Sequence, residues 1–127
     1  MKQWIGVDLD GTLAEYHGWI NAMHIGKPIP RMVARVKKLL KQGFTVKIFT
    51  ARVTLDEGRE AITANIKRWC REHIGVELEV TNVKDFGMID LYCDRCKQVV
   101  KNEGTVVGEQ AHRYYIPPKE TGKSYLN

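Results

Sequence analysis

The sequence predicts one α/β domain with a mainly parallel sheet, and two patterns support that prediction. Short apolar runs of strand length alternate along the chain with longer segments in which apolar side chains recur at helical spacing. Strands that alternate with helices join into a parallel sheet through right-handed crossovers. At 127 residues the chain is long enough to bury one core without disulfides or a structural metal.

A strand, a loop and a helix are expected in the N-terminal part of the chain. Residues 3–8 are an apolar run suited to a buried strand. Residues 14–27 have no clear period, so we expect a loop or a short flap. A helix is expected to begin at Pro30, because proline suits a first turn, and Gly43 is well placed to end it. The apolar stripe of this helix consists of Met32, Val33, Val36, Leu39 and Leu40.

The middle of the chain repeats the same alternation. Residues 44–50 predict a second strand, and residues 57–73 predict a second helix. The core face of that helix carries Ile62, Ile66, Trp69 and Cys70. The remaining expected elements are strands at 76–80 and 88–93 and a short hairpin around Asn102–Gly104.

Composition limits the kinds of protein that this chain can be. Hydrophobic residues make up 43% and charged residues 28%, which is typical of a folded globular protein. The net charge of +5 favours anionic ligands but does not by itself indicate nucleic acid. No apolar stretch has the length of a membrane helix, no signal peptide is recognisable, and three cysteines do not suggest a disulfide framework. We expect a cytoplasmic protein with a domain at 1–108, an extended tail at 109–127 and no membrane partner.

Polar and charged side chains follow each predicted strand at the point where it ends. The carboxyl ends of parallel strands meet at one edge of a sheet, which is where such folds bind ligands. Two acids, a hydroxyl, a lysine and further acids at one edge can bind a divalent cation and a phosphate together. These residues are Asp8 and Asp10, Thr50 and Arg52, Lys84, and Asp90 and Asp94.

Four segments resemble the motifs of the haloacid dehalogenase superfamily of phosphotransferases. They are DLDGT (8–12), FTAR (49–52), VKD (83–85) and DLYCD (90–94), and they occur in the order typical of that family. The resemblance covers residues 4–94. It implies a Rossmann-like three-layer sandwich with the first strand in its centre. The 14–27 insertion is too short for a separate cap domain, so the resemblance is to the capless branch.

The resemblance also implies a role for each residue of the motifs. Asp8 is the expected nucleophile, which forms an aspartyl-phosphate, and Asp10 is the expected general acid and base. Thr50 and Lys84 are expected to hold the transferring phosphoryl group. The expected cofactor is Mg²⁺, bound with the help of Asp8, Asp10, Asp94 and Asp90.

Further residues are candidates for contact with the substrate. Gly11 allows a sharp turn after the first strand, and Thr12 offers a polar contact or caps that turn. Arg52 either binds a substrate anion or forms an ion pair. Three residues of the flap either contact the substrate or pack against the domain: His17, Trp19 and His24.

The fourth motif departs from the family pattern. Close relatives of this small type have two adjacent acids, whereas here Cys93 precedes a single Asp94. Asp90 can replace the missing acid only if the strand stays regular through both positions. A neutral thiol is a poor ligand for Mg²⁺, so Cys93 is expected to weaken metal binding.

The cysteines also form a pattern that resembles a zinc site. Cys93 and Cys96 give C-x-x-C, and Cys70 with His73 gives C-x-x-H. The predicted topology places these pairs at opposite edges of the sheet, about 17 Å apart for a five-residue strand. We therefore favour a structural role for Cys70.

These observations predict a Mg²⁺-dependent phosphomonoester hydrolase that acts on a sugar phosphate or a nucleotide. An open site without a cap also admits a phosphorylated polymer end, or a second subunit that serves as a lid. One alternative is a degenerate, non-catalytic relative that binds a phosphorylated ligand or partner. A two-component receiver domain is a third possibility, but its acid pair precedes the acceptor on another strand, whereas Asp8 and Asp10 end the first one.

Overall fold

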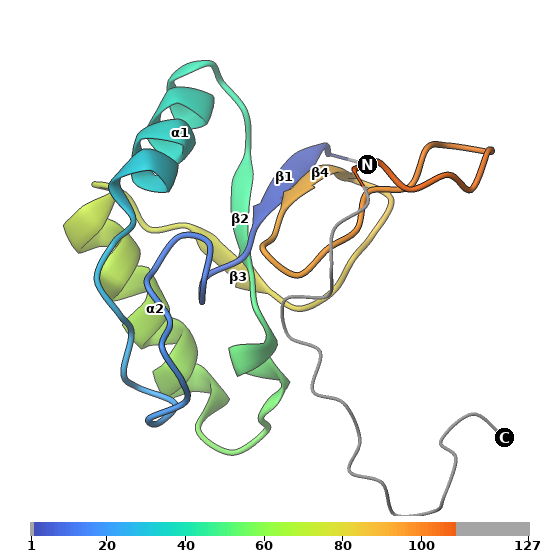
Figure 1. The fold of residues 1–127 in the computed structure, drawn as a ribbon. Helices are drawn as coiled ribbons and strands as arrows, with labels where there is room; N and C mark the ends of the chain where they lie inside the picture. The colour runs from blue at the N-terminus through green and yellow to red at the C-terminus, as the bar shows by residue number, and fades with distance from the viewer. Residues whose placement is uncertain (1, 109–127) are drawn as a thin grey trace, which may run out of the picture. The chain divides into compact units, whose positions relative to one another are not determined.

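The computed structural model of the chain describes residues 2–108, and it confirms an α/β fold with a parallel sheet (Figure 1). The chain forms two compact units, residues 1–94 and residues 95–127. The first unit contains every helix and strand of regular length among the described residues.

Four parallel strands form the sheet of the first unit, in the order β3-β2-β1-β4. Their bounds are β1 Trp4–Val7, β2 Val46–Phe49, β3 Glu79–Thr81 and β4 Met88–Tyr92. β1 lies in the interior of the sheet with β2 and β4 on its two sides, and all four of its residues are buried. This position brings the ends of β1 and β4 together, although 80 residues separate them in the sequence.

Both α-helices pack against the same face of the sheet (Figure 1). Helix α1 spans Pro30–Lys41 and helix α2 spans Arg59–His73. The crossovers β1-α1-β2 and β2-α2-β3 run in the same direction along the sheet, so right-handed connections place both helices on one side. Their apolar stripes form one core with the strands, as the 3.6-residue spacing predicts. The fully buried members of this core include Val7, Val36, Ile48, Ile66 and Cys70.

Among residues 2–108, the other face of the sheet carries a loop and no helix. The loop 82–87 returns from the end of β3 to the start of β4. Asp85 in this loop accepts a hydrogen bond of 2.8 Å from the Trp4 indole. The Trp4 ring also lies 4.7 Å from the Lys47 ammonium and 6.5 Å from the Phe49 ring. The third layer that the resemblance implies is therefore not seen in the described part of the chain.

The element boundaries agree with the sequence prediction to within one to three residues. Among residues 2–108, the one regular element that the sequence did not predict is the 3₁₀ helix η1, Ala51–Thr54, directly after β2. In the second unit, the expected hairpin occurs as an antiparallel bridge between Val99 and Val106. Asn102 and Gly104 take positive φ at its turn, 65° and 80°.

The predicted tail at 109–127 lies outside the described residues. Within the described range, no helix has the length and apolarity that crossing a membrane requires.

Candidate active site

Asp8 lies directly beyond β1, at the carboxyl edge of the sheet. Its amide donates to the Tyr92 carbonyl at 2.9 Å, which extends the parallel pairing of β1 and β4 by one residue. Cys93 and Asp94, which follow Tyr92, therefore lie next to Asp8. The Cys93 Sγ donates to the Asp8 Oδ2 at 3.8 Å. Asp8, Cys93 and Asp94 each offer one possible metal-ligand atom, and these three atoms lie within 4.8 Å of one another. The structure thus brings together the first and fourth motifs of the sequence.

The Asp8 carboxyl is poorly stabilised as an anion. Its pKa is raised to about 7, mainly by burial and then by the hydrogen bond and negative charge of Asp94, with a smaller effect of the nearby Asp10. A hydrogen bond of 2.9 Å from the Leu9 amide acts in the opposite direction. At neutral pH this carboxyl is therefore only partly ionised until a cation or another positive group approaches it.

The turn after β1 holds Asp94 in place. The Thr12 hydroxyl donates to the Asp94 Oδ1 at 2.9 Å and accepts from the Asp94 amide at 3.0 Å. Gly11 has φ +86°, and a Cβ there would come within 2.7 Å of the Asp94 Oδ2. Thr12 thus positions Asp94, and the missing Cβ of Gly11 leaves room for the Asp94 carboxylate. Leu9, between the two acids, is fully buried and anchors the turn in the core.

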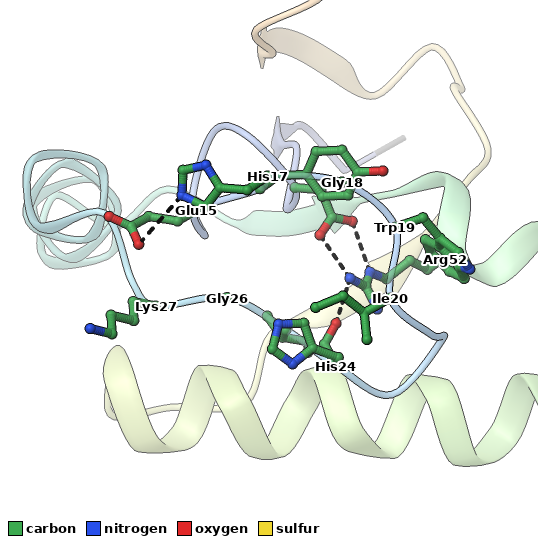
Figure 2. A pocket seen from close by; sticks show the side chains of 12 residues that line it. Glu15, His17, Gly18, Trp19, Ile20, His24, Gly26, Lys27 and Arg52 are labelled. Atoms are coloured by element: carbon green, nitrogen blue, oxygen red, sulfur yellow. Dashed lines mark hydrogen bonds and ion pairs between the residues drawn. The ribbon is translucent and has the colours of Figure 1, made fainter.

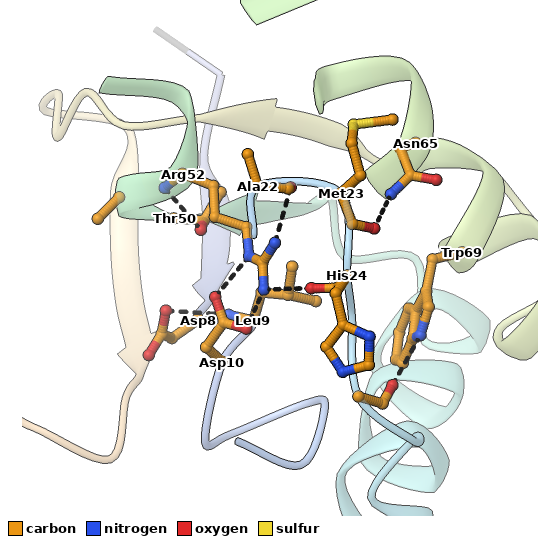
Figure 3. A network of polar contacts seen from close by, with 12 residues as sticks. Asp8, Leu9, Asp10, Ala22, Met23, His24, Thr50, Arg52, Asn65 and Trp69 are labelled. Atoms are coloured by element: carbon orange, nitrogen blue, oxygen red, sulfur yellow. Dashed lines mark hydrogen bonds and ion pairs between the residues drawn. The ribbon is translucent and has the colours of Figure 1, made fainter. Parts of the chain in front are cut away.

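Asp10 lies at the same edge but in a different environment (Figure 3). Arg52 binds both of its carboxylate oxygens, with Nε and Nη2 each at 2.8 Å. The guanidinium also donates to the carbonyls of Ala22 at 2.8 Å, His24 at 2.7 Å and Asn21 at 3.5 Å. Arg52 is 5% exposed, and all five of its N–H donors are used. Of the two expected roles of Arg52, the structure therefore shows the ion pair, and in this arrangement the guanidinium has no donor left for a substrate anion.

Thr50 ends β2 and begins η1. Its Oγ1 accepts from the Arg52 amide at 3.2 Å, which caps the 3₁₀ helix, and the side chain is buried. Among residues 2–108, no acceptor takes the hydroxyl hydrogen of Thr50. The residue therefore keeps a donor for a phosphoryl oxygen, the contact that the resemblance implies.

Among the described residues, two predicted site residues, Lys84 and Asp90, form no hydrogen bond or ion pair with Asp8 or Asp94. Lys84 is exposed in the loop 82–87, and among the described residues it forms no ion pair with an acid. Its neighbour Asp85 bonds the Trp4 indole, and that bond is the main reason that the pKa of Asp85 is lowered. Asp90 is exposed, pairs with Ile5 in the middle of β4 and does not belong to the ligand group. The strand register explains why Asp90 is not in the ligand group. The group begins at Cys93, one residue beyond Tyr92, whereas Asp90 pairs inside the strand.

The flap and Asp10 form a pocket of about 400 Å³ (Figure 2). Its wall includes Arg52 and the three flap residues expected at the site, His17, Trp19 and His24. Trp19 is 55% exposed, with its ring centroid 5.3 Å from the Arg52 guanidinium carbon. These side chains line a cavity and are not part of the core, which favours substrate contact over simple packing.

Helix α2 anchors the flap through residues that the sequence analysis did not identify as part of the site. The Asn65 amide donates to the Met23 carbonyl at 2.7 Å, and the Trp69 indole donates to the Gly26 carbonyl at 3.1 Å (Figure 3). Trp69 was predicted for its apolar ring, but its N–H also needs a partner when buried. The need of a buried indole N–H for an acceptor was therefore the feature of the sequence that could have predicted this contact.

The zinc alternative is not supported by the described residues. Cys70 is fully buried on α2, and burial raises the pKa of its thiol to about 11. Among residues 2–108, the group of potential metal ligands consists of Asp8, Cys93 and Asp94, without Cys70 or His73. The structural role predicted for Cys70 is thus confirmed.

One solved structure provides a comparison for the fold. It is a conserved protein coded by a locus of Bacteroides thetaiotaomicron, similar with a TM-score of 0.54 and 23% sequence identity. The alignment covers 76% of this chain and 78% of that chain. No family model and no curated protein gives a significant match. At this level of identity, the comparison shows that the two chains share the fold.

Proposed function

We propose that the protein is a Mg²⁺-dependent phosphomonoester hydrolase of the haloacid dehalogenase type, with Asp8 as its nucleophile. The observation that supports this most is the pair of Asp8 and Asp94. Two carboxyl groups share one strand edge, where burial and their mutual repulsion raise the pKa of Asp8 to about 7. Such a pair is costly for a fold and becomes favourable when a cation binds between the carboxylates.

The donor set fits Mg²⁺ in part. Carboxylate oxygens of Asp8 and Asp94 are the hard ligands that this cation prefers, and Cys93 adds a thiol, which it does not. Gly11 and Thr12 would keep Asp94 in its ligand position. When bound here, Mg²⁺ would neutralise the repulsion between the carboxylates and an incoming phosphate.

The residues of this edge then have distinct tasks. An Asp8 oxygen attacks phosphorus, and the bond from phosphorus to the leaving oxygen breaks as Asp10 gives that oxygen a proton. Asp10 next takes a proton from a water that attacks the aspartyl-phosphate, which releases inorganic phosphate and restores Asp8. Thr50 donates to a phosphoryl oxygen. Because both Asp10 oxygens accept bonds from Arg52, a protonated Asp10 must give up one of these bonds.

The flap pocket is the proposed place for the leaving group. A cavity of about 400 Å³ next to Asp10 is of the size that small ligands occupy, and a sugar or a nucleoside fits this description.

Lys84 has no part in the proposal, because the described residues include no contact between it and the acids. The proposal includes a cytoplasmic location, supported by the small number of cysteines.

A non-catalytic protein that binds a phosphorylated ligand is the second candidate. Two observations favour it: Cys93 occupies a metal-ligand position, and among the described residues Lys84 forms no ion pair with the carboxylates. Such a protein would bind phosphate esters without hydrolysing them.

Hydrolysis of p-nitrophenyl phosphate with and without Mg²⁺ separates the two candidates. We expect metal-dependent turnover that Asp8→Asn lowers by at least about 10³-fold, because the nucleophile is lost. Asp90→Asn is the matched control, since it removes an exposed acid from β4 away from the ligand group. Turnover by Asp8→Asn at the wild-type rate, or no turnover by the wild type with several phosphate esters, would contradict the hydrolase.

A further inference from the structure

A second concave surface of the first unit lies along helix α1 and differs in charge from the candidate active site. It is a groove of about 440 Å³ whose polar wall consists of Arg31, Arg35 and Lys38 of α1, Gln42 directly after that helix, and Tyr92 of β4. We call it the α1 groove. Arg31, Arg35, Lys38 and Gln42 follow one another at spacings of four, three and four, so they form one stripe along the helix and its C-terminal end.

The positive charge of the α1 groove is not balanced by the protein. Helix α1 carries five cations and no acid along PRMVARVKKLLK. Among residues 2–108, no acid forms an ion pair with Arg31, Arg35 or Lys38. Arg31 also lies in the first turn, where the helix dipole disfavours a cation, and that turn has no acid and no side-chain cap. Like charges at these spacings destabilise a helix, and an anionic ligand would remove this cost.

We propose that the α1 groove binds the phosphate backbone of a single-stranded nucleic acid. The seven residue steps from Arg31 to Lys38 give a rise of about 10 Å along the helix. Successive phosphates of one strand lie about 3.4 Å apart along a duplex axis, so the row spans roughly three phosphates. Three regularly placed cations thus match the repeat of a polyphosphate chain.

An aromatic contact favours a nucleic acid over an acidic peptide. The Arg35 guanidinium carbon lies 5.7 Å from the centroid of the Tyr92 ring, so a flat cation and a ring occur together in the groove. Bases of single strands stack on arginine planes and aromatic rings, whereas a duplex hides its base faces and an acidic peptide has none. Tyr92 also directly precedes Cys93, and its carbonyl accepts from the Asp8 amide. The groove therefore adjoins the candidate active site.

Fluorescence anisotropy with a labelled twelve-residue oligothymidylate tests this inference, in EDTA so that no metal-dependent hydrolysis occurs. The variant Arg31→Gln/Arg35→Gln/Lys38→Gln is compared with Lys37→Gln/Lys41→Gln/Lys101→Gln, which loses the same charge at exposed positions outside the groove. We expect the groove variant to bind at least about tenfold more weakly in low salt. The slope of log K against log salt should fall by about 2, since each phosphate contact contributes about 0.7 for a single strand.

Tyr92→Leu tests the stacking part of the inference. It should weaken binding several-fold and leave the salt slope unchanged, because the charges remain. Circular dichroism checks that each variant is folded. The inference is overturned if the wild type does not bind the oligonucleotide, if both triple variants lose equal affinity, or if polyglutamate of equal charge competes as well as the oligonucleotide. Each of these results concerns binding without metal, so the outcome is independent of whether Asp8 is a nucleophile.

Discussion

Asp8 and Asp10 lie two residues apart, yet the structure places their carboxylates in opposite electrostatic environments. Asp10 faces a buried guanidinium that binds both of its oxygens. Asp8 faces a second carboxyl, Asp94, and a thiol, and burial raises its pKa to about 7. The chain thus supplies the positive charge for one acid, whereas the other needs a proton or a cation from outside. This difference agrees with the separate tasks proposed above for two acids that look alike in the sequence.

Loss of Arg52 should have the largest effect on stability. Arg52→Met leaves the Asp10 carboxylate and two flap carbonyls without their closest donors, so we expect it to destabilise the fold by about 3 kcal/mol. Urea unfolding measures this. Arg68→Met is the matched control, because its ion pair with Glu72 is exposed and should matter by less than about 0.5 kcal/mol.

A double variant sharpens that test. Arg52→Met/Asp10→Leu removes both charges, so it should be more stable than Arg52→Met alone. If the double variant is the less stable of the two, the ion pair is not what joins Asp10 to the flap. Arg52→Lys should not restore full stability, because an ammonium cannot bind two carboxylate oxygens and the flap carbonyls in the same way.

An added acid on the Asp8 side should change metal affinity. Cys93→Asp places a third carboxylate in the ligand group, so the half-saturating Mg²⁺ concentration for hydrolysis should fall by about tenfold. Cys93→Ser, which adds a neutral oxygen, is the control and should change it much less. An unchanged half-saturating concentration for Cys93→Asp would mean that position 93 does not face the metal.

The pH dependence of stability should distinguish the two acids without any assay of activity. The folded-state pKa of Asp8 is raised, so the folded protein holds this proton more tightly than the unfolded chain does. Without metal, the contribution of Asp8 to the free energy of unfolding should therefore decrease from about pH 4 to about pH 7 and then level off. Asp8→Asn should remove this decrease in denaturant titrations across that range. An equal decrease in wild type and variant would assign it to another group.

The sequence was sufficient to predict the strands, both helices and the strand edge that carries the site. The spacing of apolar residues and the polar residues at strand ends are local signals, and they correctly predicted the buried stripe of α1 around Val36. Which strand-end residues meet at the site depends instead on strand register, and register depends on long-range pairing. Asp90 and Asp94 share one motif, but the pairing of Ile5 with Asp90 leaves only Asp94 at the end of the strand.

Side-chain partners were the part that the sequence could not provide. An ion pair of Arg52 was one expectation, but FTAR does not indicate that its partner is an acid 42 residues earlier or that flap carbonyls take part, since that contact depends on how residues 21–24 fold over η1. The motif around Lys84 likewise says nothing about the partners of this lysine, which is exposed in the loop 82–87 between β3 and β4.

The central claim is that the group of Asp8, Cys93 and Asp94 requires a cation, and the affinity for Mg²⁺ as a function of pH tests it most directly. Isothermal titration of Mg²⁺ into the wild type between pH 5.5 and 8.5 should show affinity that rises with pH up to about 7 and is constant above it, with a proton released on binding below that value. Asp8→Asn should bind weakly at every pH and release no proton, while Asp10→Asn should keep the wild-type dependence. Affinity that does not depend on pH in the wild type, or equal loss in both variants, would contradict the account.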